Sequence, residues 1–115
     1  MSSATLQSPV VDDRLDRIFH ALADRTRRAL LAMVSREPQK ITELAKPFDM
    51  SFPAVSKHLR VLEGAGLIRR AVDGRVHRCS FDATPLKEAD VWLETYRTFW
   101  TESLDALAQY AEKDR

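Results

Sequence analysis

Three polar side chains between positions 56 and 60 have the chemistry that a DNA major groove accepts. At 100° per residue on a helix, Ser56, Lys57 and Arg60 point to one side, opposite to Val55 and Leu59. Long cations of this kind reach phosphates or guanine edges, and a small serine permits close approach. Ordinary amphipathic surface helices carry similar faces, so the assignment to DNA depends on the neighbouring segments.

The residues on either side predict a helix with defined ends. Ser51 is a favourable N-cap, and Pro53 falls in the first turn, where a missing N–H costs nothing. Gly66 suits the left-handed C′ position, which lets Leu67 fold back on Leu62. The side that carries Ser56, Lys57 and Arg60, called the reading face from here on, is therefore expected on a single capped helix, the reading helix.

Residues 67–81 are predicted to form a cationic hairpin. Asp73-Gly74 lies between two β-prone runs and favours a type I′ turn. From residue 57 to 78 there are six Lys or Arg and two acids, a local net charge of +4, whereas residues 82–115 carry eight acids and four bases, a net of −4. The formal net charge of +1 conceals this separation. A cationic helix followed by a cationic hairpin is typical of a winged helix-turn-helix.

Length and composition exclude several classes of protein. The 115 residues suffice for one domain with a modest core. The single cysteine excludes an intrachain disulfide framework and suits a reducing cytoplasm. No apolar run approaches the roughly 20 residues of a membrane span. With three glycines, no phosphate-binding loop and no nucleophile elbow, we expect neither an enzyme nor a cofactor.

The N-terminal part predicts two helices. Residues 1–11 are expected to be a flexible tail ahead of one domain that spans residues 12–115. A helix then starts at Asp12 or Asp13 and runs to about residue 23, and Asp24 caps the next one. In its first turn stand three arginines, for which phosphate contact and surface ion pairing both remain open: Arg25, Arg27 and Arg28.

The middle of the chain predicts the helix-turn-helix itself. Residues 36–40 are expected to be a loop, after which Thr42 caps a short helix that Pro47 ends. Asp49-Met50 then makes the turn into the helix that carries Ser56 and Arg60. A short helix, a tight turn and a second helix form this unit.

The last predicted helix, residues 85–113, carries an aromatic stripe. Trp92, Tyr96, Phe99, Trp100 and Leu107 fall within about 100° of one another. One domain of this size cannot bury so much aromatic surface internally, which favours a dimer interface. Intrachain core and a ligand pocket remain the alternatives.

Taken together, the chain resembles a bacterial ArsR-type winged helix-turn-helix transcriptional repressor. The resemblance rests on residues 21–28 (ALADRTRR), on residues 50–68, and on Gly74-Arg75 in the wing. It implies a mainly α fold with one β-hairpin, and a homodimer held by helices at both ends (about 12–23 and 85–113). It also implies binding to an inverted-repeat operator in double-stranded DNA.

The resemblance assigns roles to two sets of residues. Phe52 stands where the family often has a polar residue, so apolar base contact is expected there. The DNA-binding set comprises Ser51, Phe52, Ala54, Ser56, Lys57, Arg60, Arg70, Arg75 and Arg78. The dimer set comprises Leu15, Phe19, Trp92, Tyr96, Phe99, Trp100 and Leu107.

Many members of the family sense metals, but the ligands used for that purpose are missing here. The segment 41–46 has no cysteine and the last helix has no histidine. Transition-metal sites need about three or four convergent ligands. The sequence therefore predicts no metal site, and it leaves any inducer unidentified.

Two alternatives to this function stay open. In the first, the same DNA-binding fold uses Cys79 as a redox switch, because the flanking His77 and Arg78 favour a thiolate. In the second, the chain is an interaction module that uses its aromatic helix and never contacts DNA. The cationic helix face has no explanation under the second alternative.

Overall fold

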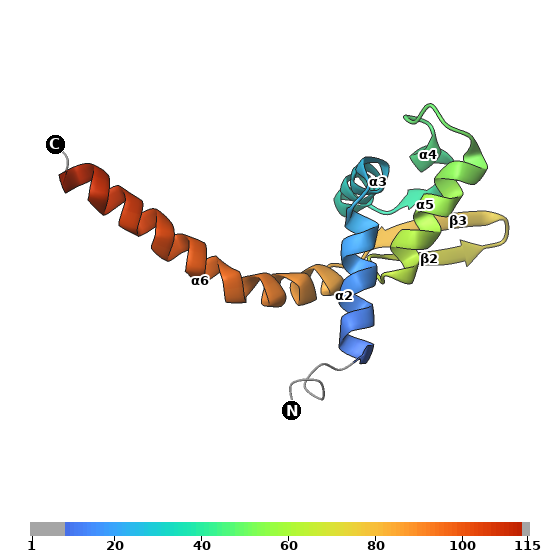
Figure 1. Cartoon of the computed structure of the whole chain (residues 1–115). Helices are drawn as coiled ribbons and strands as arrows, with labels where there is room; N and C mark the ends of the chain where they lie inside the picture. The colour runs from blue at the N-terminus through green and yellow to red at the C-terminus, as the bar shows by residue number, and fades with distance from the viewer. Residues whose placement is uncertain (1–8, 114–115) are drawn as a thin grey trace.

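The computed structural model describes residues 9–113. The elements follow in the order α2 (Pro9–Leu22), α3 (Arg25–Arg36), β1 (Gln39–Lys40), α4 (Ile41–Ala45), α5 (Phe52–Gly64), β2 (Ile68–Asp73), β3 (Val76–Phe81) and α6 (Thr84–Lys113). The predicted fold class, mainly α with a hairpin and a long C-terminal helix, is confirmed (Figure 1).

The first helix begins earlier than expected. Of the expected tail, residues 1–8 lie outside the described part of the chain, whereas residues 9–11 already belong to α2. Proline is accommodated in a first helical turn, where its missing N–H has no helical partner. Helix α2 therefore starts at Pro9 and not at Asp12 or Asp13.

Helices α4 and α5 form the helix-turn-helix. Thr42 lies within α4 and does not cap it, since the N-cap is Lys40, which makes no side-chain cap bond. At the start of α5, the predicted cap is confirmed, because Ser51 Oγ accepts from the backbone N–H of Ala54 at 3.2 Å.

The end of α5 also matches its prediction. Gly66 has a φ of +77°, its N–H donates to the Glu63 carbonyl, and the Leu67 N–H donates to the Leu62 carbonyl at 3.0 Å. These two bonds make a Schellman motif, which satisfies carbonyls that the helix leaves free. Both ends of the predicted reading helix are thus fixed by the sequence.

The hairpin is present, but its turn lies one residue later than predicted. Asp73 pairs with Val76, so Gly74 and Arg75 are the two turn residues. Gly74 has a φ of +65°, while Arg75, like the other non-glycine residues described, keeps a negative φ. Positive φ at the first central residue alone is the property of a type II′ turn, so the type I′ prediction was wrong.

The expected loop at residues 36–40 ends in a short strand. Gln39 pairs with Cys79 and Lys40 with Arg78, which gives a three-stranded antiparallel sheet in the order β1-β3-β2. The free edge of β3 offers unpaired N–H and carbonyl groups, and β1 satisfies some of them. No side-chain pattern of two residues could have indicated this strand.

The core lies between α3, α4, α5 and the sheet. Fully buried side chains come from each of these elements: Leu30 of α3, Leu44 of α4, Leu59 and Leu62 of α5, and Cys79 of β3. Val55, Leu59 and Leu62 form the buried side of α5, as its periodicity predicts. This anchoring determines which side of α5 faces outward.

Helix α6 leaves this body and extends away from it (Figure 1). The Cα radius of gyration is 19.3 Å, whereas a compact domain of this length has about 13 Å. Every residue from Thr98 to Lys113 is exposed. Within the described residues, no helix has the length and apolarity needed to cross a membrane.

Candidate nucleic-acid interface

The predicted reading face lies on the outer side of α5. Phe52, Lys57 and Arg60 are exposed, while Ala54 and Ser56 are half-buried on the same helix. Since Val55 and Leu59 are fully buried, rotation of α5 about its axis would expose core residues. The helix therefore presents these side chains in a fixed orientation.

The wing adds two exposed cations. Arg75 occupies the turn and Arg78 lies on β3, and both side chains are exposed. Helix α5 and strand β2 pack side by side, and the hairpin tip projects beyond the body (Figure 1). Arg75 thus adds a cation at the hairpin tip, suited to the backbone of a groove that α5 enters. Arg78 is adjacent to the buried Cys79, so its side chain points to the side of the sheet away from the core and α5, and its assignment to DNA stays a prediction.

Arg70 is oriented differently from the other arginines of the DNA-binding set. Successive residues of β2 alternate between the two sides of the sheet, and Arg70 shares the inner side with the buried Ile68. Its side chain is 17% exposed, and its Nη2 lies 3.5 Å from Oε1 of Glu63 on α5. Arg70 thus lies between the wing and α5.

The arginines of α3 have a structural role that the sequence analysis missed. Arg27 is buried, and its guanidinium donates to the carbonyls of Ala21 at 2.9 Å and His20 at 2.8 Å, at the end of α2. Arg28 donates to the Leu22 carbonyl at 2.7 Å. These bonds add charged donors to the carbonyls at the C-terminus of α2, where cations are also favoured by the helix dipole.

Arg27 also connects α3 to α5. Its Nη1 lies 3.1 Å from Nδ1 of His58, a half-buried residue, as expected for a histidine at the edge of the core. Asp24 caps α3 as predicted, and the N–H that Arg27 donates to it holds the pKa of Asp24 below its usual value. One arginine thereby fixes the junction of three helices.

We expect Arg27→Met to destabilise the protein by about 2–3 kcal/mol, because buried carbonyls lose a charged donor while the side-chain volume is kept. Urea unfolding followed by circular dichroism, at one fixed protein concentration, measures this change. Arg25→Met is the matched control, since Arg25 is exposed in the same turn. Equal stabilities of the two variants would contradict the role of Arg27.

Cys79 does not have the surroundings of a redox switch. Its side chain is fully buried in the core beneath the sheet. Burial raises the pKa of the Cys79 thiol, which disfavours the reactive thiolate at neutral pH. The neighbouring guanidinium of Arg70 opposes this effect but is the weaker influence. The first alternative function therefore loses its chemical basis.

The described residues do not bring metal ligands together. Over residues 9–113, no group of three or more His, Cys, Asp or Glu side chains is placed to share one ion. His58 is engaged with Arg27 on α5, while His77 and Cys79 lie on β3. The expectation that the chain has no metal site stays a prediction.

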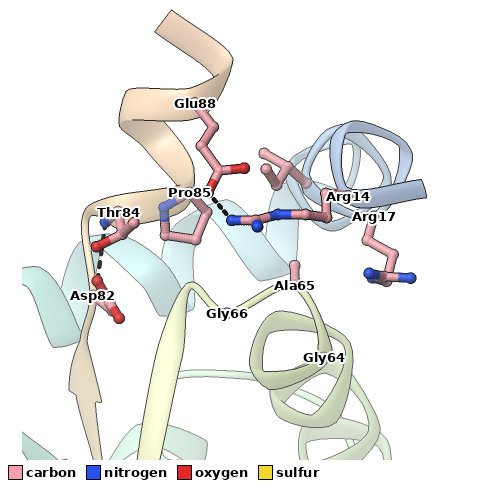
Figure 2. Close-up of a pocket in the computed structure, with 10 residues that line it drawn as sticks. Arg14, Arg17, Gly64, Ala65, Gly66, Asp82, Thr84, Pro85 and Glu88 are labelled. Carbon is pink, nitrogen blue, oxygen red and sulfur yellow. Dashed lines mark hydrogen bonds and ion pairs between the residues drawn. The ribbon is translucent and has the colours of Figure 1, made fainter. Parts of the chain in front are cut away.

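The start of α6 is joined to the body by polar contacts. Asp82 Oδ1 accepts from the Thr84 N–H at 2.9 Å, and this bond lowers the pKa of Asp82. Arg14 of α2 forms an ion pair with Glu88 of α6, and both residues line a pocket with Pro85 and Gly66 (Figure 2). A Cβ on Gly66 would lie 3.4 Å from Pro85. Helix α6 therefore leaves the body at a defined place.

The predicted dimer residues lie on one connected surface. The Phe19 ring of α2 meets Trp92 edge-on at 5.5 Å between centroids, and Trp92 lies 5.0 Å from Tyr96. Farther along α6, Trp100 is 45% exposed and Phe99 70% exposed. Leu15 is half-buried and Leu107 is exposed.

This apolar surface is wider than predicted. Val91 and Leu104 are also exposed on α6. At 100° per residue Leu104 lies beside the edge of the stripe near Trp100, whereas Val91 lies on the opposite side of α6, so neither falls within the stripe.

Comparisons with known proteins identify the family and the fold of this chain. Residues 24–70 match the family model described as "Bacterial regulatory protein, arsR family". The chain is 39% identical over 101 residues to the HTH-type transcriptional regulator Rv2034 of Mycobacterium tuberculosis, covering 86% of this chain and 90% of that one. It is 28% identical over 79 residues to the transcriptional repressor SdpR of Bacillus subtilis, covering 69% and 88%. The crystal structure of an ArsR family transcriptional regulator aligns with a TM-score of 0.74 and 43% identity, covering 83% and 95%.

Proposed function

Because the chain belongs to the ArsR family of bacterial regulatory proteins, we propose that it is a homodimeric repressor that binds an inverted-repeat operator in double-stranded DNA. As a transcriptional regulator with a winged helix-turn-helix, it contacts DNA through α5 and the wing. Operator binding assigns its site of action to the cytoplasm, where bacterial DNA lies.

The observation that carries this proposal is the outer face of α5. The helix is capped at both ends and anchored by Val55 and Leu59, so Ser56, Lys57 and Arg60 face outward together. Arg75 in the wing turn extends the same charge. An interaction module with no DNA partner would have no use for this fixed cationic face.

The dimer part of the proposal rests on α6. Aromatic and aliphatic side chains stay exposed along a helix whose last 16 residues, 98–113, meet no other part of the described chain closely enough to be buried. A contiguous apolar surface of this kind marks an association site. We assign it to a second copy of the chain, because a two-fold dimer presents two α5 helices to one inverted repeat.

The repressor part draws on a relative. SdpR of Bacillus subtilis is a transcriptional repressor that aligns with 69% of this chain. A dimer that occupies an operator within a promoter excludes polymerase sterically. No enzymatic step is required for this mechanism.

The proposal is tested by selecting duplexes from a random pool with the purified full chain. We expect recovery of an inverted repeat whose half-sites are about one helical turn apart. Binding should weaken steeply with salt, since several phosphate contacts release counterions. Recovery of unrelated duplexes, with no enrichment over repeated rounds, would contradict the proposal.

We expect micromolar Zn²⁺, Cd²⁺ or arsenite to leave operator binding unchanged, because α4 lacks cysteine and α6 lacks histidine. Fluorescence anisotropy of a labelled operator, measured with each ion and with EDTA, checks this result. Stoichiometric tight Zn²⁺ binding that lowers DNA affinity would contradict it.

A further inference from the structure

A cleft of about 450 Å³ lies between the wing, α4 and α5, on the same side as the predicted reading face. Phe52 and Ser56 of α5 line it from one side, and Arg70, Val76 and His77 of the wing line it from the other. Its volume is in the range of small-molecule sites. A ligand placed there would contact residues that the proposed function assigns to DNA.

Two residues that line this cleft, Arg70 and His77, carry buried polar atoms without partners in the described part of the chain. Nε and Nη2 of Arg70 and Nδ1 of His77 are shielded from solvent, and none of them has a hydrogen-bond partner in the described part of the chain. Arg70 Nη2 lies 3.5 Å from the Glu63 carboxylate without forming a hydrogen bond. Buried groups of this kind are normally satisfied in native proteins. The wall of the cleft therefore has two residues with unsatisfied polar atoms, next to the exposed cation Arg75.

The rest of the lining is apolar. Ile41, Phe52 and Val76 contribute aliphatic and aromatic surface, and Phe52 is half exposed at the first turn of α5. A phenylalanine at this position offers no hydrogen bond to a base edge. As a wall of the cleft, it would instead cover the apolar body of a small ligand.

We propose that this cleft binds a small amphipathic anion, an acidic group on an apolar body, and that the bound anion competes with DNA. The acidic group accepts from the Arg70 guanidinium and from His77, and the apolar body packs against Phe52 and Val76. The competition rests on the proposed function, whereas binding of the anion does not. Such a ligand would act as an inducer without any metal site.

The test uses 8-anilinonaphthalene-1-sulfonate, an aromatic body with one sulfonate, added to the full-length protein. We expect a shift of the Arg70 Nε–H signal in nitrogen-15 NMR spectra together with saturable probe fluorescence. Arg70→Met should weaken this binding at least tenfold, whereas Arg69→Met should change it less than twofold. Arg69 loses the same charge from the same strand but lies exposed on its other side. Equal binding by the two variants would overturn the proposal.

A second variant keeps the test informative if Arg70→Met does not fold. Phe52→Gln alters an exposed residue, so circular dichroism should remain that of the parent while probe affinity falls severalfold. Unchanged affinity in this variant would contradict the assigned apolar wall.

Two further measurements distinguish a small-molecule anion from the phosphate of a DNA backbone. Inorganic phosphate at the same concentration should move the Arg70 signal far less than the probe. Equal shifts would mean that the site takes bare phosphate, as in a DNA backbone, and would overturn the small-molecule proposal.

An unrelated short duplex should displace the probe, and simultaneous binding of both would refute competition. A chain that binds duplex DNA but not the probe refutes this inference alone, whereas one that binds the probe but no DNA refutes the proposed function.

Discussion

Trp100→Ala is expected to lower the association constant of the proposed dimer about a thousandfold. Trp100 is 45% exposed on α6, so a partner chain has a large part of its ring to cover. Burial of this surface yields about 2 kcal/mol, and each dimer loses two such rings. Operator affinity should fall with it, although Trp100 lies on α6, far along the chain from α5.

The dependence on concentration identifies the mechanism. Because the loss acts through the monomer–dimer equilibrium, it should grow on dilution and shrink at high protein concentration. Sedimentation velocity gives the dimer constant, and anisotropy with a labelled operator gives the affinity. Glu102→Ala is the control, since Glu102 lies 200° around the helix from Trp100. A loss that stays constant on dilution would contradict the role of Trp100.

Trp92 is less suitable than Trp100 for a test of the dimer interface. Its ring already contacts Phe19 and Tyr96 within the same chain. Trp92→Ala should therefore weaken both the dimer and the packing of α6 on α2. A fall in unfolding free energy at protein concentrations low enough for both variants to be monomeric, absent from Trp100→Ala, would distinguish the two residues.

Arg60→Ala and Arg75→Ala are expected to weaken operator binding in different ways. Arg60 is exposed on the outer face of α5, where an arginine can reach a base edge. Its loss should cost about 1–3 kcal/mol and relax the preference at one base pair. Arg75 lies in the wing turn, and its loss should weaken all sequences alike and make the salt slope shallower by roughly one unit.

These two substitutions serve as controls for each other. Both remove one exposed arginine, so they change the net charge equally. Anisotropy titrations against the selected operator, single-base variants of it and an unrelated duplex, at two salt concentrations, separate the effects. Equal and sequence-independent losses from both variants would contradict the assignment of Arg60 to base edges.

The parts of the fold that could be predicted are those determined by local chemistry. The caps at Ser51 and Gly66 act within a few residues, so the limits of α5 follow from the sequence. The buried side of α5 follows from its periodicity for the same reason. Each of these signals needs no knowledge of distant segments.

The parts that could not be predicted depend on contacts between distant residues. Strand β1 exists because Gln39 meets Cys79, 40 residues later. Arg27 reaches backbone carbonyls of α2, which no pattern of side chains encodes. The turn was assigned one residue early because Asp73 also suits a strand end, and pairing with Val76 decides its place.

The candidate site also has parts that local spacing predicts and parts that depend on distant contacts. The outward placement of Lys57 and Arg60 follows from helical spacing. The inward placement of Arg70 follows from strand alternation with Ile68, but its contact with Glu63 depends on the packing of α5 against β2. The cleft beside Arg70 is formed by α4, α5 and the wing together, and so it could be found only in the folded chain.

The central claim is that two chains bind one inverted repeat through paired α5 helices. Sedimentation equilibrium of the purified protein with a labelled duplex that carries the selected repeat measures the stoichiometry directly. We expect two chains per duplex, and no stable intermediate with one chain at concentrations where the free protein is dimeric. A folded monomer at micromolar concentration that binds the two-half-site duplex with full affinity would contradict the account.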